Sequence, residues 1–133
     1  MKKKLILFGN GGQASVVEDT VNKLNYVVYS KIYIKKNKLY DSRLKKFIKE
    51  EYILKNYKNF KFHLAIGDLI VRDKILKKFK NKLKFVSIIS KYAIISSKSK
   101  IGPGTYISEK SVIKNDVAPI FSKNLNNCSI YIL

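Results

Sequence analysis

The chain has 133 residues, which is enough for one domain with a sizeable core or for one domain and part of a second. The formal net charge of +19 is almost all lysine spread along the chain, so we expect a solvated basic surface rather than a specific nucleic-acid site. No apolar run reaches the roughly 18–20 residues of a membrane span, no signal peptide is apparent and one cysteine excludes an internal disulfide, so we expect a cytoplasmic protein.

The first predicted element is a strand at residues 5–8, a continuous apolar run that the glycine-rich turn 9–12 ends. Such a run is typical of a strand buried on both faces of a parallel sheet. Ala14, Val17 and Val21 then recur at helical spacing. Strand, glycine turn and helix in this order predict the opening of a βαβ unit.

The next part of the chain is less regular. Residues 26–34 are dense in Val, Ile and Tyr and predict a second strand, and residues 35–40 form a polar connection. In residues 41–57, Leu44, Phe47 and Ile48 can form a helical face after a cap at 41–42, and residues 52–54 can continue it. A short strand near residues 47–48 is the competing interpretation, and both remain open.

The pattern then returns to strand and helix. Residues 62–66 predict a third strand, which Gly67 and Asp68 end, and residues 71–79 predict an amphipathic helix. Residues 85–88 predict a last strand. The fold class is therefore α/β, with a Rossmann-like parallel-sheet domain over residues 1–88.

Residues 89–117 show a different period, because isoleucine recurs every six residues at 89, 95, 101, 107 and 113. A six-residue period fits neither a helix nor a simple strand, and it predicts stacked short sides of a parallel β-helix with a tight corner at residues 102–104. A meander of ordinary strands is the alternative. The repeats make fewer than two coils, and residues 118–133 lose the pattern and form an irregular tail, so this β-helix is incomplete.

Two strand-to-helix junctions contain candidate binding residues. The turn Gly9, Asn10, Gly11 and Gly12 presents N–H groups at a helix start, where an anion can bind, although a plain tight turn explains it equally well. Gly67, Asp68 and Arg72 form the second junction. Both junctions are predicted at the carboxyl edge of the sheet, and Asp68 can cap its helix at the same time.

No catalytic residue or metal site is predicted. His63 is the single histidine, and it lies inside an apolar strand, where a packed side chain is the simpler explanation. The chain has no histidine or cysteine pair for a metal.

Three motifs together resemble one family, the sugar O/N-acetyltransferases of the sialic acid O-acetyltransferase (NeuD) type and the UDP-4-amino-sugar N-acetyltransferase (PglD) type. They are the glycine turn after residues 5–8, the stretch Ala65-Ile66-Gly67-Asp68, and Ile101-Gly102-Pro103-Gly104-Thr105. The resemblance covers residues 3 to about 117.

Membership in this family implies a Rossmann-like domain that binds a UDP-sugar or amino sugar through Gly9–Gln13, Gly67, Asp68 and Arg72. It also implies a left-handed β-helix that forms a homotrimer and binds acetyl-CoA between subunits. A histidine general base would assist acetyl transfer in bacterial surface-glycan synthesis.

The chain departs from the family at three places: Gln13 replaces a histidine, Lys35 and Lys36 replace an acidic pair, and no residue matches the catalytic histidine. We therefore interpret it as a truncated member, inactive alone, and a frameshifted origin of residues 118–133 is one hypothesis for the irregular tail. A non-catalytic nucleotide-sugar-binding or regulatory module is the alternative. The acceptor sugar and the choice between N- and O-transfer stay open.

Overall fold

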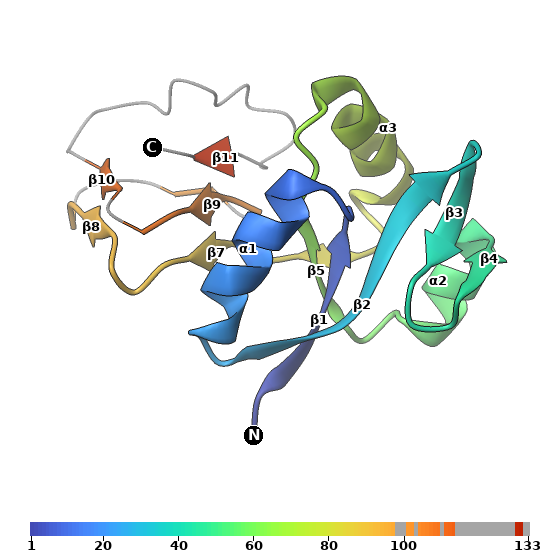
Figure 1. Ribbon diagram of the computed structural model, residues 1–133, viewed down its shortest axis with the longest axis horizontal. Coiled ribbons are helices and arrows are strands. Elements are labelled where there is room, and N and C mark those ends of the chain that lie inside the picture. Colours follow the sequence, from blue (N-terminus) through green and yellow to red (C-terminus); the bar gives the residue numbers. More distant parts are fainter. Residues whose placement is uncertain (98–100, 103, 110, 114–129, 132–133) are drawn as a thin grey trace.

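A computed structural model describes residues 1–97, 101–102, 104–109, 111–113 and 130–131 (Figure 1). Its centre is a six-stranded sheet with the strand order β4-β3-β2-β1-β5-β6. The strands are β1 (Lys3–Phe8), β2 (Tyr26–Lys35), β3 (Lys38–Asp41), β4 (Lys46–Ile48), β5 (Lys61–Leu64) and β6 (Lys84–Phe85). Four neighbouring strands, β2, β1, β5 and β6, are parallel, and β3 and β4 extend the sheet by antiparallel pairing.

Helices cover both faces of this sheet. The helices are α1 (Gly12–Asn22), α2 (Glu50–Asn56) and α3 (Leu69–Phe79). Residues of α1 pack on one face, and residues of α2 and α3 pack on the other. Within the described part of the chain, no helix is long and apolar enough to cross a membrane.

The central strand β1 is buried on both faces, as its apolar run predicts. Leu5 and Leu7 pack with α1, while Ile6 and Phe8 pack with the α2 and α3 side. All four side chains are fully buried. Side chains that alternate along β1 therefore contribute to two separate apolar layers, one on each face of the sheet. The predicted α/β class is confirmed.

The prediction of a polar connection at residues 35–40 was wrong. The chain reverses at Lys36 and Asn37, whose φ angles of 51° and 61° lie in the left-handed region, and returns as β3. Two consecutive left-handed residues are typical of the tightest β-hairpin turns. Leu39 is buried on the returning strand, and one aliphatic residue between Lys38 and Tyr40 is too weak a pattern to predict it.

The helical interpretation of Leu44, Phe47 and Ile48 was also wrong, and the competing short strand is confirmed as β4. Cross-strand pairing decides this, because Phe47 lies opposite Tyr40 and Ile48 lies opposite Leu39. The helix of this region, α2, begins only at Glu50. The predicted strand 85–88 is divided, with Phe85 in β6 and Ile88 in the next strand.

The described C-terminal strands are short and pair in parallel. They are β7 (Ile88–Ile89), β8 (Ile94–Ile95), β9 (Tyr106–Ile107), β10 (Val112–Ile113) and β11 (Ile130–Tyr131). Ile88 lies beside Tyr106, and Ile94 lies beside Val112, so in both pairs the partners are 18 residues apart (88 to 106, 94 to 112). An ordinary meander would pair antiparallel.

The repeating isoleucines come together in space. Ile107 and Ile113 are buried, and Ile89, Ile95 and Ile101 pack against them. This cluster lies beside the main sheet, and Tyr106 connects the two. The hydroxyl of Tyr106 shares a hydrogen bond of 2.9 Å with Thr20 of α1. Of the predicted tail, 118–133, all but residues 130–131 lie outside the described residues.

Candidate functional site

The glycine turn brings three strands close together. Gly9 has a φ of 129°, and its N–H donates to the carbonyl of Ile32 in β2, with an N to O distance of 2.8 Å. A Cβ atom at Gly9 would lie 2.3 Å from the carbonyl oxygen of Ala65 after β5. Only glycine fits this position, because both the φ angle and the contact exclude a side chain.

The start of α1 is open to a ligand. Gly11 is the N-cap residue and has no side chain to cap the helix, and no side-chain cap hydrogen bond forms among the residues that the structure describes. Gly11 and Gly12 are exposed, and a Cβ at either would contact nothing within 4 Å among the described residues. Unpartnered N–H groups together with the positive end of the helix dipole favour an anion here.

These groups border a cavity of about 500 Å³ at the carboxyl edge of the sheet. Six of the eight predicted binding residues line it: Gly9, Asn10, Gly11, Gly12, Gln13 and Gly67. The two junctions therefore meet at one site, as the topology of a parallel sheet predicts. None of the lining residues is charged, so an anion would bind there through N–H groups and amides.

Gln13 contributes an amide to this site. Its Nε2 atom is buried, and it has no hydrogen-bond partner among the residues that the structure describes. Its Cβ lies 4.0 Å from the position of a Cβ on Gly67. A buried donor without a partner is costly, and a ligand oxygen in the cavity would satisfy it.

The other two predicted residues do not line the cavity. Asp68 caps α3, because its carboxylate accepts from the N–H groups of Ile70 and Val71 at 2.9 and 3.2 Å. Arg72 is 2 % exposed and lies inside the fold, near enough to His63 to lower the pKa of that imidazole. The predicted capping role of Asp68 is confirmed.

His63 is a packed residue, as its apolar strand predicts. It is fully buried, and its Nδ1 lies 2.8 Å from the carbonyl oxygen of Val86. Burial, with a smaller contribution from the charge of Arg72, lowers the pKa of His63 to about 4. The neutral ring therefore belongs to the core. In the described part of the chain, no group of acidic, histidine or cysteine side chains could hold a metal ion.

Sequence reasoning missed the apolar wall of the cavity. Tyr33 and Ile34 come from the end of β2, Ile66 follows β5, and Val71 and Ile75 come from α3. The end of the second strand and the spacing of four residues in the helix were the available signals. These signals indicate that the side chains are buried. Only the tertiary arrangement shows that they face a cavity.

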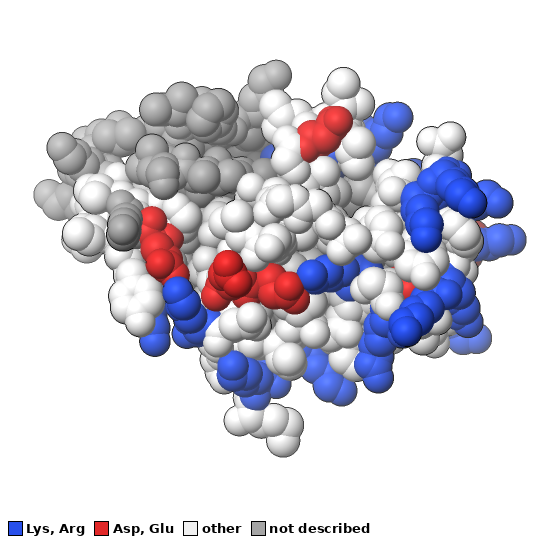
Figure 2. Space-filling model, viewed as in Figure 1, with Lys and Arg blue, Asp and Glu red and all other residues white. Residues whose placement is uncertain are grey.

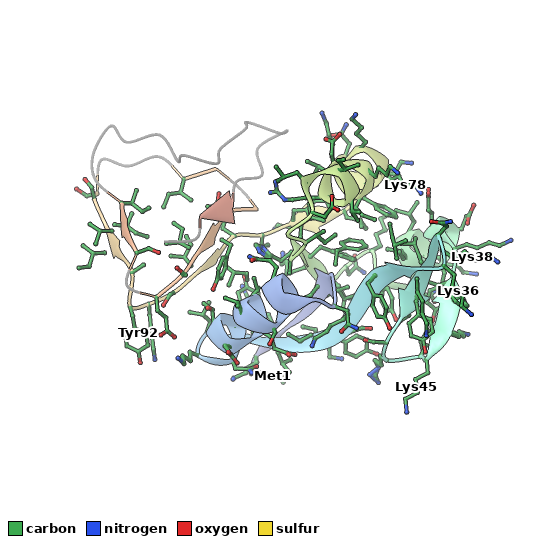
Figure 3. The ribbon with its side chains drawn as sticks, turned by 45° about the horizontal axis from the view of Figure 1, so that its top comes forward. Met1, Lys36, Lys38, Lys45, Lys78 and Tyr92 are labelled. Carbon is green, nitrogen blue, oxygen red and sulfur yellow. The ribbon has the colours of Figure 1, made fainter. Side chains whose placement is uncertain are left out.

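The basic side chains gather beyond this wall. Figure 2 shows lysine and arginine around the right-hand part of the face that carries α1, over β2, β3 and β4. Lys36, Lys38 and Lys45 are exposed and project away from the hairpins (Figure 3). Of these, Lys36 and Lys38 lie at the β2–β3 turn, next to the end of β2 that lines the cavity, so this side of the molecule attracts anions.

A family model described as the PglD N-terminal domain matches residues 4–79. Among curated proteins, none matches the chain. The solved structures include PerB from Caulobacter crescentus in complex with CoA and GDP-perosamine. PerB is 20 % identical with a TM-score of 0.67, and the match covers 87 % of this chain and 56 % of PerB.

The acetyltransferase domain of PglB from Neisseria gonorrhoeae is also similar, at 22 % identity and a TM-score of 0.60, with 84 % of this chain and 56 % of the PglB domain covered. A further structure of that domain contains acetyl coenzyme A. The chain thus spans a little over half the length of these structures, and their similarity shows the fold. The family model covers more than half of the chain, so this protein belongs to the PglD N-terminal domain family, that of the PglD-type sugar N-acetyltransferases.

Proposed function

We propose that this chain is the nucleotide-sugar-binding part of an acetyl-CoA-dependent sugar acetyltransferase of surface-glycan synthesis. The cavity between the glycine turn and the end of β5 carries the proposal, because it combines an uncapped helix start with an apolar wall. A nucleotide-linked amino sugar offers the matching diphosphate and rings. The PerB structure contains such a compound, GDP-perosamine.

The diphosphate would lie against the N–H groups of Gly11 and Gly12, and the amide of Gln13 would donate to a ligand oxygen. These groups neutralise an anion without a charged side chain. Asp68 holds the second junction by capping α3 rather than by touching the ligand.

We further propose that residues 89–117 form the first coils of a left-handed β-helix. The parallel pairing at a separation of 18 residues equals three six-residue sides, and the clustered isoleucines support it. In such an enzyme, acetyl-CoA would bind along a completed β-helix. A homotrimer and an acceptor of the UDP-amino-sugar or sialic acid type belong to the same proposal.

We infer that none of the 133 residues of this chain acts as the general base for acetyl transfer. His63 is their single histidine, and it is buried at the sheet with its Nδ1 engaged. This observation favours the second candidate, a nucleotide-sugar-binding or regulatory module that acts without catalysis. In either case the cavity binds the nucleotide sugar.

Calorimetric titration of the purified chain with GDP-perosamine and with a UDP-linked amino sugar tests binding. We expect at least one to bind, and Gly11→Asp to weaken it at least tenfold, because the new carboxylate caps the open N–H groups and repels phosphate. Thermal stability should not fall in this variant. Equal affinity of the variant, or no binding of either compound, would contradict the proposal.

Acetyl transfer is tested separately, with acetyl-CoA and the bound sugar. We expect no acetylated product from this chain alone. Product formation above the uncatalysed rate would show that this chain supplies a general base of its own, and would contradict this part of the proposal.

A further inference from the structure

One face of the strands β2, β3 and β4 is covered by no helix of the described chain. On this side of the sheet α1 packs over β1 and the start of β2, against Leu5, Leu7 and Val28. Figure 1 shows that α1 leaves β3 and β4 uncovered. An ion pair of 2.9 Å between Lys31 of β2 and Glu18 of α1 lies at the border between the covered and the open part.

Three aromatic side chains cross this open face in a row. Tyr33 of β2 lies opposite Tyr40 of β3, and Tyr40 lies opposite Phe47 of β4. Adjacent ring centroids are 5.4 and 5.3 Å apart, and the planes are inclined at 55° and 76°, so no ring of this row stacks face to face on its neighbour. None of the three belongs to the apolar clusters of the described residues, and Phe47 is 43 % exposed. This aromatic row therefore offers ring surface to a flat ligand.

Lysines surround the aromatic row. Because side chains alternate between the two faces of a strand, Lys35 shares the face of Tyr33, and Lys38 shares the face of Tyr40. The Nζ atom of Lys35 lies 4.5 Å from the centroid of the Tyr40 ring. Three more exposed lysines lie in the adjoining turns and at the end of β4, namely Lys36, Lys45 and Lys49. These five lysines form no ion pair with a described residue.

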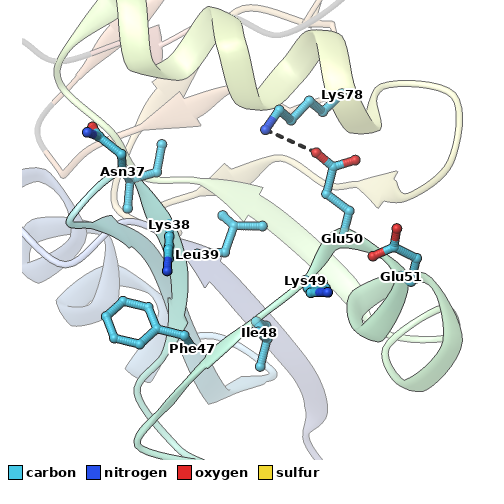
Figure 4. A pocket seen from close by; sticks show the side chains of 10 residues that line it. Asn37, Lys38, Leu39, Phe47, Ile48, Lys49, Glu50, Glu51 and Lys78 are labelled. Carbon is cyan, nitrogen blue, oxygen red and sulfur yellow. Dashed lines mark ion pairs between the residues drawn. The ribbon is translucent and has the colours of Figure 1, made fainter.

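The acidic side chains near these strands lie away from the aromatic row. The opposite side of the strands borders a second hollow of about 620 Å³, between the β2–β3 turn, the start of α2 and the end of α3 (Figure 4). Ile34, Glu50 and Glu51 help to line it, and Glu50 pairs with Lys78 at 3.0 Å. Within residues 31–49 the single acid, Asp41, is buried. The basic residues of the same segment are Lys31, Lys35, Lys36, Lys38, Arg43, Lys45, Lys46 and Lys49. The open face therefore attracts a polyanion.

We propose that the open face of β2, β3 and β4 binds single-stranded nucleic acid without regard to its sequence. Bases stack on aromatic rings, and the phosphates between them contact lysines. A double helix fits less well, because its bases are stacked on one another and offer no free ring faces. This inference is independent of the proposed function: Tyr33 also lines the glycine-turn cavity, but Tyr40 and Phe47 do not.

An anionic membrane is the other polyanionic surface that lysines attract. Attachment to a bilayer through aromatic residues needs rings that protrude into its interface. Here Lys36 and Lys45 protrude at the turns (Figure 3), whereas the aromatic rings lie along the strands between them. The arrangement favours a nucleic-acid strand that lies across the sheet.

Fluorescence anisotropy with a labelled oligothymidylate of about 20 nucleotides tests this surface. We expect the wild-type chain to bind it at least about tenfold tighter than a DNA duplex of equal length at the same salt concentration. Tyr40→Val and Phe47→Val should each lower the affinity about tenfold, and Phe47→Tyr, which keeps a ring, should retain it. Lys35→Gln should make the logarithmic salt dependence shallower by about 0.7, the contribution of one phosphate contact.

Tyr92→Val is the matched control. Tyr92 is 57 % exposed and lies 5.3 Å from the Nζ atom of Lys91, but it is outside the aromatic row. This substitution should change the affinity less than about twofold. Thermal unfolding shows whether each variant folds, and Phe47→Leu replaces a valine variant that does not.

Four results would each overturn the proposal. They are no binding of oligothymidylate, equal affinity for the duplex, losses in Tyr40→Val and Phe47→Val no larger than in Tyr92→Val, and binding to phosphatidylglycerol vesicles without binding to the oligonucleotide. Gly11→Asp separates this surface from the glycine-turn cavity. It should weaken the nucleotide sugar only, and a loss of oligothymidylate binding as large as that of Tyr40→Val would place the strand at the cavity instead.

Discussion

Gly9 is the residue at which the site and the fold depend most directly on each other. A side chain there would meet the carbonyl of Ala65 at 2.3 Å and would need a φ of 129°. We expect Gly9→Ala to lower the free energy of unfolding by at least about 2 kcal/mol, measured by urea denaturation.

Gly12→Ala is the control for this prediction. Gly12 begins α1 in open space, so a methyl group there should change the stability by less than about 1 kcal/mol, and in the stabilising direction. Equal destabilisation by the two substitutions would show that the close approach at Gly9 is not the cause.

Asp41 is a buried carboxylate at the end of β3 that ties the β3–β4 turn to β2 and to Tyr57. It is fully buried and accepts from the Ser30 hydroxyl at 2.6 Å, from the backbone N–H groups of Arg43 and Leu44, and from the Tyr57 hydroxyl. Burial, and then this bond to Asp41, raises the pKa of Tyr57.

We expect Asp41→Ala to lower the free energy of unfolding by about 3 kcal/mol or more, because several buried donors lose their acceptor. Tyr57→Phe removes one donor and should cost about 1 kcal/mol. Thermal and urea unfolding measure both, and a smaller loss for Asp41→Ala than for Tyr57→Phe would contradict this assignment.

His63 makes the stability depend on pH. Its pKa is about 4 in the folded chain and near 6.5 when unfolded, so between these values the unfolded chain binds more protons. Stability attributable to His63 is therefore full above pH 6.5 and is lost as the pH falls toward 4, by up to about 3 kcal/mol. Urea unfolding from pH 4 to 8 should show a smaller loss for His63→Gln than for the wild type. Parallel curves would refute this.

At the scale of elements, the β2–β3 hairpin carries exposed lysines and forms one side of the second hollow. Its turn holds two non-glycine residues in the left-handed region, at φ 51° and 61°. Glycine is free of this strain, so we expect Lys36→Gly to raise the stability by about 0.5–1 kcal/mol.

Lys38→Gly is the comparison, because Lys38 begins β3 and glycine weakens strands by about the same amount. Differential unfolding experiments on the two variants should give opposite signs. Destabilisation by Lys36→Gly would mean that the lysine side chain, and not the turn conformation, decides the effect.

The strands and helices also show which elements a sequence pattern can predict and which it cannot. The apolar run at residues 5–8 predicted β1, and the helical spacing that begins at residue 14 predicted α1. Both patterns are local. The strands β3 and β4 were missed or left open because three or four residues with one buried aliphatic side chain hold no clear period. Pairing with β2, which is a long-range contact, forms them.

At the scale of the whole molecule, Tyr106 joins the C-terminal strands to the α/β sheet. Its side chain is 1 % exposed, packs in the cluster of Leu5, Leu7 and α1, and shares a hydrogen bond with Thr20. Burial raises the pKa of Tyr106, and its hydroxyl stays protonated. The predicted domain boundary at residue 88 thus falls where the two parts share a core.

We expect Tyr106→Ala to lower the free energy of unfolding by about 3–5 kcal/mol and to lower the melting temperature of the whole chain. Ile94→Ala is the control, because Ile94 is 66 % exposed and should change stability by less than about 1 kcal/mol. A separate early transition in Tyr106→Ala, with the main transition unmoved, would contradict the shared core.

The sequence by itself determined the α/β class, the family and the glycine turn that borders the cavity, since runs, periods and glycine turns are local signals. Only the tertiary structure decided that Gln13 and Gly67 meet, that Arg72 lies in the core, and that β3 and β4 form a second hollow beside Ile34. The physical reason is that a local pattern shows which side chains are buried. Which neighbours bury them depends on strand pairing and helix packing across the whole chain.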